Sequence, residues 1–445
     1  MHSDNNRSGI PLTLPSLPEV ERGDGTGSLP TCALLSQCAG RDDAASSGGC
    51  GLAHSVHDSF EEVAGLQAEW DRFVEERDGD LFSTFDGCRI WWKHYGDGRR
   101  LEIHLFREGE RLVGVFPLFR ETLRFGPVAV RLIRLVGCDH SVTTCGFAVH
   151  PDHTAQVVAS LMARISHGPP WDMIHLGPLP GYFRGRDHAA AAFAGHAAVG
   201  RILSSADDGP HIVFDLPESN EAYLAGLASR ERNNIKSRKR KLEKGHAVCE
   251  SMASADEVSS WFDGFVAQHQ RQWQAENQLG HFVDWPGSEA FHREMAATMT
   301  KSGRLRLLRL EVDGKAAGFQ YNYRFGRRVH WILGSRDHDP CWDQFSLGRY
   351  LLCSTIEHAI AEGAGQLDAM RGMYHYKLQL GGALLNLQSI AVVRRGIGAE
   401  LRVRSARFAA RILHLAYYRV LFGRLAPRLP FLRGPLWRRW IRSRI

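Results

Sequence analysis

The sequence predicts a duplicated mixed α/β (α+β) fold in which two similar halves are each built on a mixed sheet. Three observations predict it: a strand–turn–strand pattern that occurs twice, the same order of elements after each copy, and a composition suited to a hydrophobic core. Of the 445 residues, 44% are hydrophobic and 10% are aromatic, as in globular proteins. A chain of this length holds two or three domains.

The repeated pattern is a hairpin. Its first copy is LEIHLFREGERLVGVFPL, residues 101–118, and its second is LRLLRLEVDGKAAGFQYN, residues 305–322. Each consists of two apolar runs separated by an acidic residue and a glycine, which is typical of a tight turn between antiparallel strands.

The order of elements after each hairpin also recurs: a strand that ends in a polar loop, an apolar helix, and a short strand beside a glycine. These elements are expected at 133–147, 157–165 and 172–178 in the first copy and at 330–344, 348–363 and 366–372 in the second. Four successive elements in one order favour a duplicated domain. Coincidence is the alternative, because hairpins with such turns are common.

Composition divides the chain into four parts. The first is rich in Gly, Ser, Pro and Asp without a sustained apolar period, which indicates disorder. The last is rich in Arg. The predicted parts are a leader at 1–52, a first half at 53–215, a second half at 216–395 and an amphipathic tail at 396–445.

Cysteine usage and hydropathy favour a cytoplasmic protein. The nine Cys are odd in number and form no C-x-x-C, which argues against a disulfide framework and a structural zinc site. No signal peptide or membrane-spanning stretch is expected. His338 between Asp337 and Asp339 is a weak metal cue that fits a polar loop better, so no metal is predicted.

The stretch SRERNNIKSRKRKLEKGH, residues 229–246, contains eight Lys or Arg among eighteen residues. It has three interpretations: a solvated helix face, a site for an anionic ligand, or a nucleic-acid patch. Nucleic acid is disfavoured, because the chain outside residues 394–445 carries a net charge of −7.

The order of several motifs carries a family resemblance. They are RKLEKG (240–245), HQRQW (269–273), the second hairpin, ILGSRD (332–337), FSLGRYLL (345–352) and GMYHYKLQLGG (372–382). With these motifs the second half resembles the BioF2-like acetyltransferase domain of the GNAT superfamily. The first half, with FSTFDGCRIWWKHYG and LVGVFPL, is similar to CelD-type proteins of polysaccharide and cellulose operons. The same double-GNAT architecture occurs in FemAB peptidyltransferases.

The resemblance implies acyl transfer from a thioester donor, with acetyl-CoA as co-substrate. In GNAT folds the donor's pyrophosphate sits at a helix N-terminus, where free N–H groups and the helix dipole attract phosphate. The candidates here are Ser346, Leu347, Gly348 and Arg349. The family's Gln/Arg-x-x-Gly-x-Gly/Ala pattern is incomplete, with only Gly348 in place. The alternative is an ordinary helix start capped by Ser346.

Candidate catalytic residues lie near the end of the second half. Asp368, between apolar neighbours, is a candidate base with a raised pKa. The alternative is a structural carboxylate paired with Arg371. Tyr376 and Lys377 match the family's Tyr-Lys pair, and Lys377 is expected to hold a phosphate or to steady a tetrahedral intermediate.

The acceptor is expected beside these groups. Tyr374 and Tyr376 would share one face of a strand. The residues predicted to contact the acceptor are Arg336, Asp337, Trp342, Tyr374 and Arg371.

The tail is strongly cationic. Residues 394–445 contain fourteen Arg and one acid, a net charge of +13, with apolar residues at helical spacing and two Trp near the end. Such segments suit a membrane interface, so we expect peripheral contact with the inner membrane through 400–445. A helix packed on the body and a nucleic-acid contact are the alternatives.

The resemblance, supported by the repeat and the helix start at Gly348, implies an acyltransferase that moves an acetyl group to an amine or hydroxyl of a sugar or polysaccharide precursor. A second hypothesis keeps the FemAB-like fold but uses aminoacyl-tRNA as donor. A third is a non-catalytic accessory protein of a polysaccharide synthase. The second half holds the longer polar loops and the Tyr-Lys segment, so the active site is expected there.

Overall fold

The structure is a computed structural model that describes residues 51–445 apart from 206–207, 277–279, 418–419 and 421–432. The predicted leader, 1–52, lies outside the described residues except at its end, where β1 begins at Leu52. A part of the predicted tail also lies outside them.

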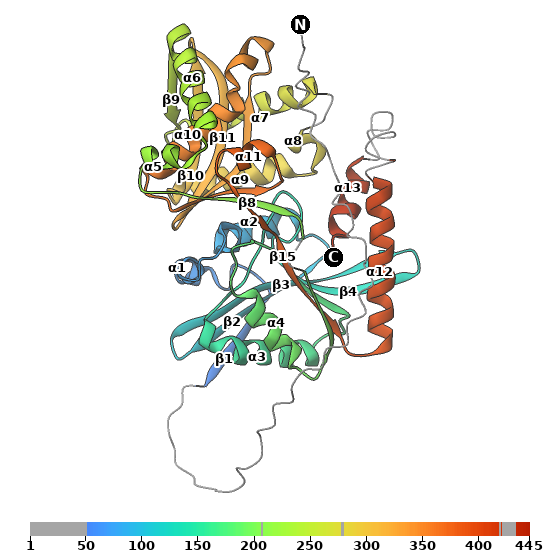
Figure 1. Cartoon of the computed structure of the whole chain (residues 1–445). Coiled ribbons are helices and arrows are strands. Elements are labelled where there is room, and N and C mark those ends of the chain that lie inside the picture. The colour runs from blue at the N-terminus through green and yellow to red at the C-terminus, as the bar shows by residue number, and fades with distance from the viewer. Residues whose placement is uncertain (1–50, 206–207, 277–279, 418–419, 421–432) are drawn as a thin grey trace, which may run out of the picture. The chain divides into compact units, whose positions relative to one another are not determined.

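The first sheet draws strands from both ends of the described chain (Figure 1). In spatial order its strands are β1 (Leu52–His57), β2 (Arg100–Glu108), β3 (Arg111–Phe125), β4 (Val128–Leu135), β6 (Met173–Leu179), β15 (Gln388–Arg394) and β7 (Val199–Ser205), with β5 (Ala148–Val149) paired to β3. The helices of this part are η1 (Ala64–Leu66), α1 (Gln67–Glu76), η2 (Leu81–Ser83), α2 (Phe85–Tyr95), η3 (Pro151–His153), α3 (Thr154–His167) and α4 (Arg186–Ala194).

The second sheet has seven strands. In spatial order they are β14 (Ala383–Asn386), β8 (Pro210–Asp215), β13 (Gln366–Arg371), β12 (Arg328–Arg336), β11 (Lys315–Phe325), β10 (Leu305–Val312) and β9 (Val248–Met252). The helices of this part are α5 (Asn220–Gly226), α6 (Ser229–Gly245), α7 (Val258–Ala275), α8 (His281–Asp284), α9 (Ser288–Lys301), η4 (Pro340–Phe345), α10 (Leu347–Ala361) and α11 (His375–Gln379).

The predicted duplication is confirmed. The series β2, β3, β4, α3 and β6 in the first half corresponds in order to β10, β11, β12, α10 and β13 in the second. Both hairpins turn where predicted, and their turn residues Gly109, Asp313 and Gly314 have φ values of 57°, 52° and 73°. In each half the helix leads into a strand parallel to the one before it, since β4 pairs with β6 and β12 with β13 in parallel.

The two sheets exchange strands across the boundaries predicted from the sequence. β8 falls at the end of the predicted first half, 53–215, but pairs with β13 and β14 in the second sheet. β15 falls within the predicted second half, 216–395, but lies between β6 and β7 in the first sheet. An apolar pattern identifies a strand but not its partner, so the exchange could not be predicted from local sequence.

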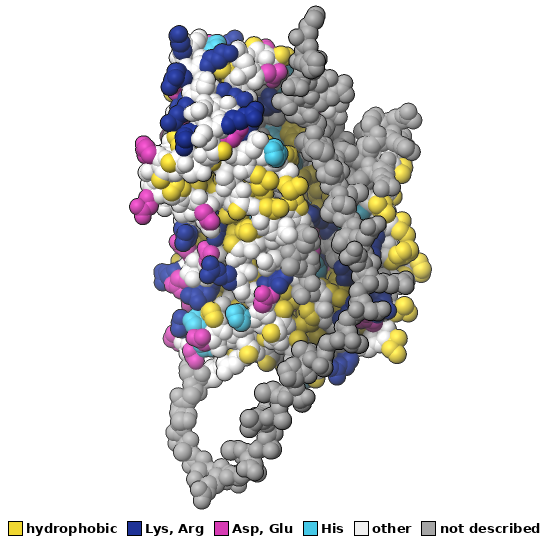
Figure 2. Space-filling view, in the orientation of Figure 1, with side chains coloured by type: hydrophobic (Ala, Val, Ile, Leu, Met, Phe, Trp, Pro, Cys, Tyr) yellow, Lys and Arg dark blue, Asp and Glu magenta, His cyan; other side chains and the backbone are white. Residues whose placement is uncertain are grey.

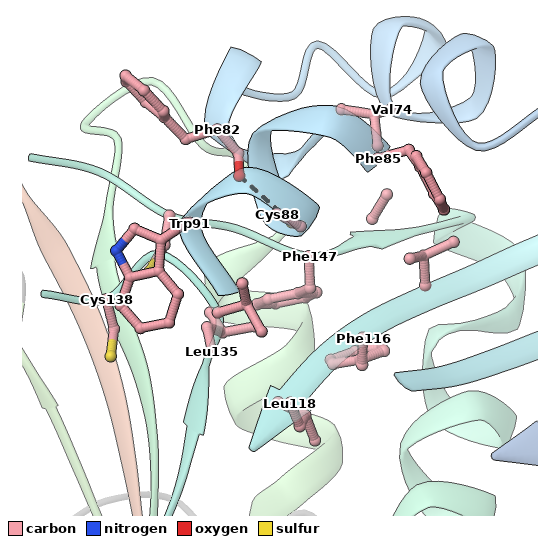
Figure 3. Packing of buried hydrophobic residues seen from close by; sticks show 14 of the residues in the cluster. Val74, Phe82, Phe85, Cys88, Trp91, Phe116, Leu118, Leu135, Cys138 and Phe147 are labelled. Atoms are coloured by element: carbon pink, nitrogen blue, oxygen red, sulfur yellow. Dashed lines mark hydrogen bonds between the residues drawn. The ribbon is translucent and has the colours of Figure 1, made fainter. Parts of the chain in front are cut away.

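The hydrophobic core of the first half holds η2 in place (Figure 3). Trp91 of α2 is fully buried, and the ring of Phe116 on β3 stacks on that of Phe147 with 4.5 Å between centroids. The Cys88 thiol of α2 donates a hydrogen bond to the carbonyl of Phe82 in η2 at 3.3 Å. Truncating a buried aromatic ring of this kind costs about 3–5 kcal/mol, so η2 is firmly anchored.

The tail contains α12 (Ile397–Ala416) and α13 (Arg433–Arg442). α12 contacts β4 and β15 (Figure 1), and its Val403 and Ala406 are buried against Val130, Leu132 and Val393. One face of α12 is therefore packed on the body of the protein, which was one of the alternatives for the tail.

Candidate active site

The parallel strands β12 and β13 are paired over three residues and then separate. The ladder joins residues 328–330 of β12 to residues 366–368 of β13, although β12 continues to Arg336. Beyond the ladder β13 changes direction, with Met370 at φ 57° and Gly372 at φ 122°. A left-handed backbone is unusual for Met and indicates a constrained turn. A gap therefore opens between the two strands past the paired residues.

Lys377 fills this gap. Its Nζ donates a hydrogen bond to the carbonyl of Ala369 at 2.7 Å and lies 4.8 Å and 5.0 Å from the ring centroids of Trp331 and Tyr374. Ala369 and Trp331 are the first residues of β13 and β12 past the ladder. Lys377 is only 2% exposed, and this burial lowers the pKa of its amine to about 7 against the opposing attraction of Asp368. Near neutral pH the amine therefore exists in both protonation states.

The segment that carries Lys377 is a helix rather than the strand we predicted. It forms α11, and Tyr374 is the N-cap residue. The prediction was wrong because an alternation over four residues fits a turn of helix as well as a short strand. The rings of Tyr374 and Tyr376 lie 5.8 Å apart, and burial raises the pKa of both phenols. Both therefore remain protonated hydrogen-bond donors near the gap.

Asp368 lacks the raised pKa that we predicted for a general base. Its Oδ1 accepts hydrogen bonds from Nε2 of His211 on β8 at 2.7 Å and from the Met370 amide at 2.8 Å. Burial alone would raise the pKa of Asp368, but His211, which donates a hydrogen bond from Nε2, and the Met370 amide outweigh burial and hold it below the usual range. The carboxylate stays ionised and is a poor proton acceptor near neutral pH.

The N-terminus of α10 lacks a side-chain cap. Ser346 has a left-handed backbone, with φ 51° and ψ 58°, and its side chain makes no capping hydrogen bond, which contradicts the alternative of an ordinary capped start. A Cβ on Gly348 would lie 3.6 Å from Cδ of Arg336, an ordinary contact, so packing does not require glycine there. Leu347 is buried in the core. The helix start and the Arg336 guanidinium form a cationic corner at the far end of β12.

Arg349 joins three helices. Its Nη2 donates hydrogen bonds to Glu231 of α6 and to Gln379 of α11, both at 2.8 Å. The arginine thus holds the start of α10 next to the helix that carries Lys377. Because Glu231 already neutralises its charge, Arg349 is poorly placed to supply charge to a donor phosphate, and the predicted donor contact stays a prediction.

Three residues predicted to contact the acceptor have other partners. Arg371 donates from Nη2 to the Asp208 carbonyl at 3.1 Å rather than pairing with Asp368. The Trp342 ring packs 5.4 Å from that of His246, beyond the end of α6. Asp337 accepts a hydrogen bond from the backbone of its own loop at 3.1 Å. The contacts described here do not join them to Lys377.

The basic stretch forms α6, in which Leu242 is the buried residue. A narrow pocket lies between α6 and α10. Charges at its wall pair with one another, as Glu231 does with Arg349 and Lys239 with Glu357 at 3.1 Å. Such paired charges fit helix packing better than phosphate binding. The outer side of α6 exposes cations, which Figure 2 shows gathered over this helix.

Sequence reasoning missed Trp331, His330 and His211. Trp331 and His330 lie inside an apolar strand, where no local pattern distinguishes them from core residues. His211 comes from a strand whose pairing with β13 is long-range. The neighbouring Lys377 was identified through the family's Tyr-Lys motif, and Asp368 through its apolar sequence neighbours.

The comparisons with known proteins now identify the second half. Residues 229–378 match the family model of the acetyltransferase (GNAT) domain. The chain contains a GNAT acetyltransferase domain. The resemblance to the GNAT superfamily and the prediction of an acyltransferase of the GNAT type are confirmed. The matched residues include the gap between β12 and β13, the start of α10 and Lys377.

Solved structures extend the likeness beyond the matched domain. The structure of FemX superposes with a TM-score of 0.54 at 11% identity, covering 74% of this chain and 96% of FemX, which shows a shared fold. A conserved protein of unknown function from Bacteroides thetaiotaomicron VPI-5482 has a TM-score of 0.46 at 12% identity, covering 74% and 97%. A tandem GNAT protein from the clavulanic acid biosynthesis pathway has 0.37 at 14% identity, covering 78% and 99%. No curated protein sequence matches the chain.

Proposed function

We propose that this GNAT protein transfers an acetyl group from acetyl-CoA to an amine or hydroxyl of a sugar or polysaccharide precursor. The observation that carries the proposal is the Lys377 amine, held in the gap between β12 and β13 with a pKa of about 7. A base with a pKa near the working pH is the most effective kind for accepting a proton during acyl transfer.

Acyl transfer requires a base that takes the proton of the attacking amine or hydroxyl and a group that donates a hydrogen bond to the oxyanion. One N–H of the neutral Lys377 amine is directed to Ala369, and its lone pair is free to take the proton of the acceptor's amine or hydroxyl. The acceptor then attacks the thioester carbonyl, the carbon–sulfur bond breaks, and the CoA thiolate leaves with a proton returned from Lys377. The phenols of Tyr374 and Tyr376 are the candidate donors to the oxyanion.

The donor phosphates fit the cationic corner at the start of α10. Five residues of extended strand, about 17 Å, separate Trp331 beside Lys377 from Arg336 beside Gly348. An elongated donor can therefore lie along β12 with its thioester at Lys377 and its phosphates at the α10 N-terminus. The sugar acceptor rests on the resemblance of the first half to CelD-type proteins.

Replacing Gly348 by Asp should weaken acetyl-CoA binding, because the new carboxylate would repel the phosphates at the helix start. We expect micromolar binding of acetyl-CoA and of desulfo-CoA by isothermal titration, and at least a tenfold weaker Kd in Gly348→Asp. Gly65→Asp is the matched control, since it adds the same charge in open space of the first half. No binding by folded wild-type protein would reject acetyl-CoA as donor.

Aminoacyl-tRNA is the second candidate donor, and the exposed cations of α6 favour it. They are Arg230, Lys236, Arg240, Lys241 and Lys244. A gel shift with charged tRNA separates the two donors.

A third candidate, an accessory role at a polysaccharide synthase, would be favoured if a variant lacking Asp368, Tyr376 and Lys377 kept polysaccharide output in cells.

Membrane contact through α12 belongs to the same proposal. Leu401, Phe408 and Ile412 are 63%, 67% and 52% exposed along one side of α12, where Figure 2 shows apolar side chains at the surface. Arg404 and Arg411 are exposed on the same helix. Apolar residues flanked by arginine suit the surface of an anionic bilayer. Among the described residues, no helix has the length and apolar character needed to cross a membrane.

Changing Leu401, Phe408 and Ile412 together to Gln should reduce binding to phosphatidylglycerol vesicles at least tenfold, since each inserted side chain contributes about 1.5–3 kcal/mol. Co-sedimentation measures the effect. Leu384→Gln removes an apolar side chain that is 48% exposed elsewhere and should leave binding unchanged. Equal sedimentation of the triple variant and wild type would reject the membrane contact.

A further inference from the structure

Three side chains from distant segments meet in the interior. Asp80 precedes η2, His330 lies on β12 and Asp368 lies on β13. All three are buried, and one nitrogen or oxygen atom from each lies within 4.8 Å of the others. This set consists of two carboxylates and one imidazole, which are common ligands of divalent metal ions.

Several polar atoms of this cluster have no hydrogen-bond partner within the described residues. They are both ring nitrogens of His330 and Oδ2 of Asp368. The closest approach between them is 3.9 Å, from His330 Nδ1 to Asp368 Oδ2, which is too long for a hydrogen bond. An unpaired buried polar group costs about 1–3 kcal/mol, so the facing pair of His330 Nδ1 and Asp368 Oδ2 indicates a missing partner.

Hydrogen bonds from neighbouring residues fix the orientation of the Asp80 and Asp368 carboxylates. Oδ2 of Asp80 accepts hydrogen bonds from Thr144 at 2.8 Å and from the Tyr182 hydroxyl at 3.3 Å. Oδ1 of Asp368 accepts one from His211, whose other ring nitrogen accepts from the Gly181 amide at 3.0 Å. The His211 tautomer is thereby fixed with its proton on Nε2. Outer contacts of this type hold metal ligands in position.

The local charge favours a cation. Asp80 and Asp368 bring two carboxylates into the interior, and the nearby cations are Arg328 and Lys377. Nη2 of Arg328 is engaged with Asp78 at 2.9 Å, and its guanidinium lies 3.6 Å from the ring centroid of Tyr182. Nζ of Lys377 donates to the carbonyl of Ala369. In the described part of the chain neither cation forms an ion pair with Asp80 or Asp368, and buried carboxylates without a direct counter-charge are costly unless a cation is bound.

We propose that Asp80, His330 and Asp368 bind one divalent transition-metal ion, with Zn²⁺ as the reference ion. The nitrogen ligand disfavours Mg²⁺ and Ca²⁺, which prefer oxygen. Tetrahedral ligands at about 2.1 Å from zinc lie about 3.4 Å apart, so small side-chain rotations bring the 3.9 Å pair into range. The ion would join the segment before η2 to the end of the β12–β13 ladder, where the gap occupied by Lys377 opens.

Metal content tests the site independently of acyl transfer. The full chain is treated with a chelator, desalted and titrated with Zn²⁺ alone. We expect one tightly bound equivalent and a higher Tm, because an ion that binds the folded state stabilises it. In His330→Ala we expect the Kd for Zn²⁺ to rise about 100-fold or more, since a direct ligand is lost.

His292→Ala is the matched control. His292 is fully buried, and both of its ring nitrogens lack a hydrogen-bond partner within the described residues, as in His330. This variant should lose similar packing yet keep wild-type zinc affinity. Zinc binding that is equal in His330→Ala and His292→Ala would assign the ion to other groups, such as the exposed thiols of Cys249 and Cys341, and would overturn the proposal.

If His330→Ala fails to fold, two other measurements still test the metal site. Asp368→Asn keeps the shape of the side chain and should also weaken zinc binding at least tenfold. Wild-type protein loaded with Co²⁺ should show the absorption of a low-coordinate site with nitrogen and oxygen ligands. Absence of stoichiometric metal in folded wild-type protein would overturn the proposal and leave a bridging water as the partner.

Discussion

Replacing Lys377 by Met should lower the rate of acyl transfer about 10²–10⁴-fold, the usual contribution of a general base. Met keeps the length and apolar stem of the side chain but has no lone pair that can accept a proton in this pH range. Purified wild type and Lys377→Met are compared by kcat/KM at pH 8. Lys239→Met is the control, because Lys239 is paired with Glu357 on the other side of α10.

The pH profile separates a base from a structural lysine. Burial lowers the pKa of Lys377 from an ordinary 10.5 to about 7, so the neutral amine accumulates as the pH rises through 7. We expect kcat/KM of wild type and Lys239→Met to rise across that pH, and the residual rate of Lys377→Met to lack the rise. A wild-type profile that is flat from pH 6 to pH 8 would contradict the assignment.

Unfolding measurements provide a second check on the same pKa. In the unfolded chain Lys377 regains a pKa near 10.5, so between about pH 7 and pH 10.5 the unfolded state binds more protons than the folded state. The stability of wild type relative to Lys377→Met should therefore rise with pH in that window, by up to roughly 1.4 kcal/mol per pH unit. A stability difference that does not depend on pH would mean that the buried amine has an ordinary pKa.

The sequence predicts features that depend on local pattern. The acidic-Gly turns located both hairpins, because few backbone conformations reverse an antiparallel pair so tightly. The apolar runs located α3 and α10, and the order of these elements led to the duplicated fold. Lys377 was found because the Tyr-Lys motif belongs to a family pattern, although its helix was assigned as a strand.

Features that depend on partners far away in the chain could not be predicted. The pKa of Asp368 is set mainly by burial and by His211, which is separated from it by 157 positions and enters through the exchanged strand β8. Apolar neighbours in the sequence suggested a raised pKa, yet the imidazole reverses its direction. The same applies to Asp80 of the first half, which lies close to His330 and Asp368 of the second half only through the tertiary fold.

The first half contains a buried ionic network that links its sheet to the tail. The side chains of Arg99 and Arg134 are fully buried and contact Glu121 and Asp139 at 2.7–3.3 Å. Arg134 also donates to the backbone carbonyls of Arg442, the last residue of α13, and of Arg444. Burial alone would raise the pKa of Asp139, but Arg99 and its neighbours hold it well below the usual range. Both carboxylates therefore depend on the two arginines.

Replacing Arg134 by Leu should reduce the free energy of unfolding by about 3–5 kcal/mol, because the two buried carboxylates Glu121 and Asp139 would then share the single charge of Arg99. Urea denaturation measures the change. Arg293→Leu is the control: its side chain is 42% exposed and pairs with Asp263 and Glu289, so we expect a loss below about 1 kcal/mol. If charge imbalance is the cause, adding Glu121→Gln to Arg134→Leu should recover part of the loss. A single-variant loss no larger than that of Arg293→Leu, or a double variant weaker than the single, would show that the network contributes by packing alone.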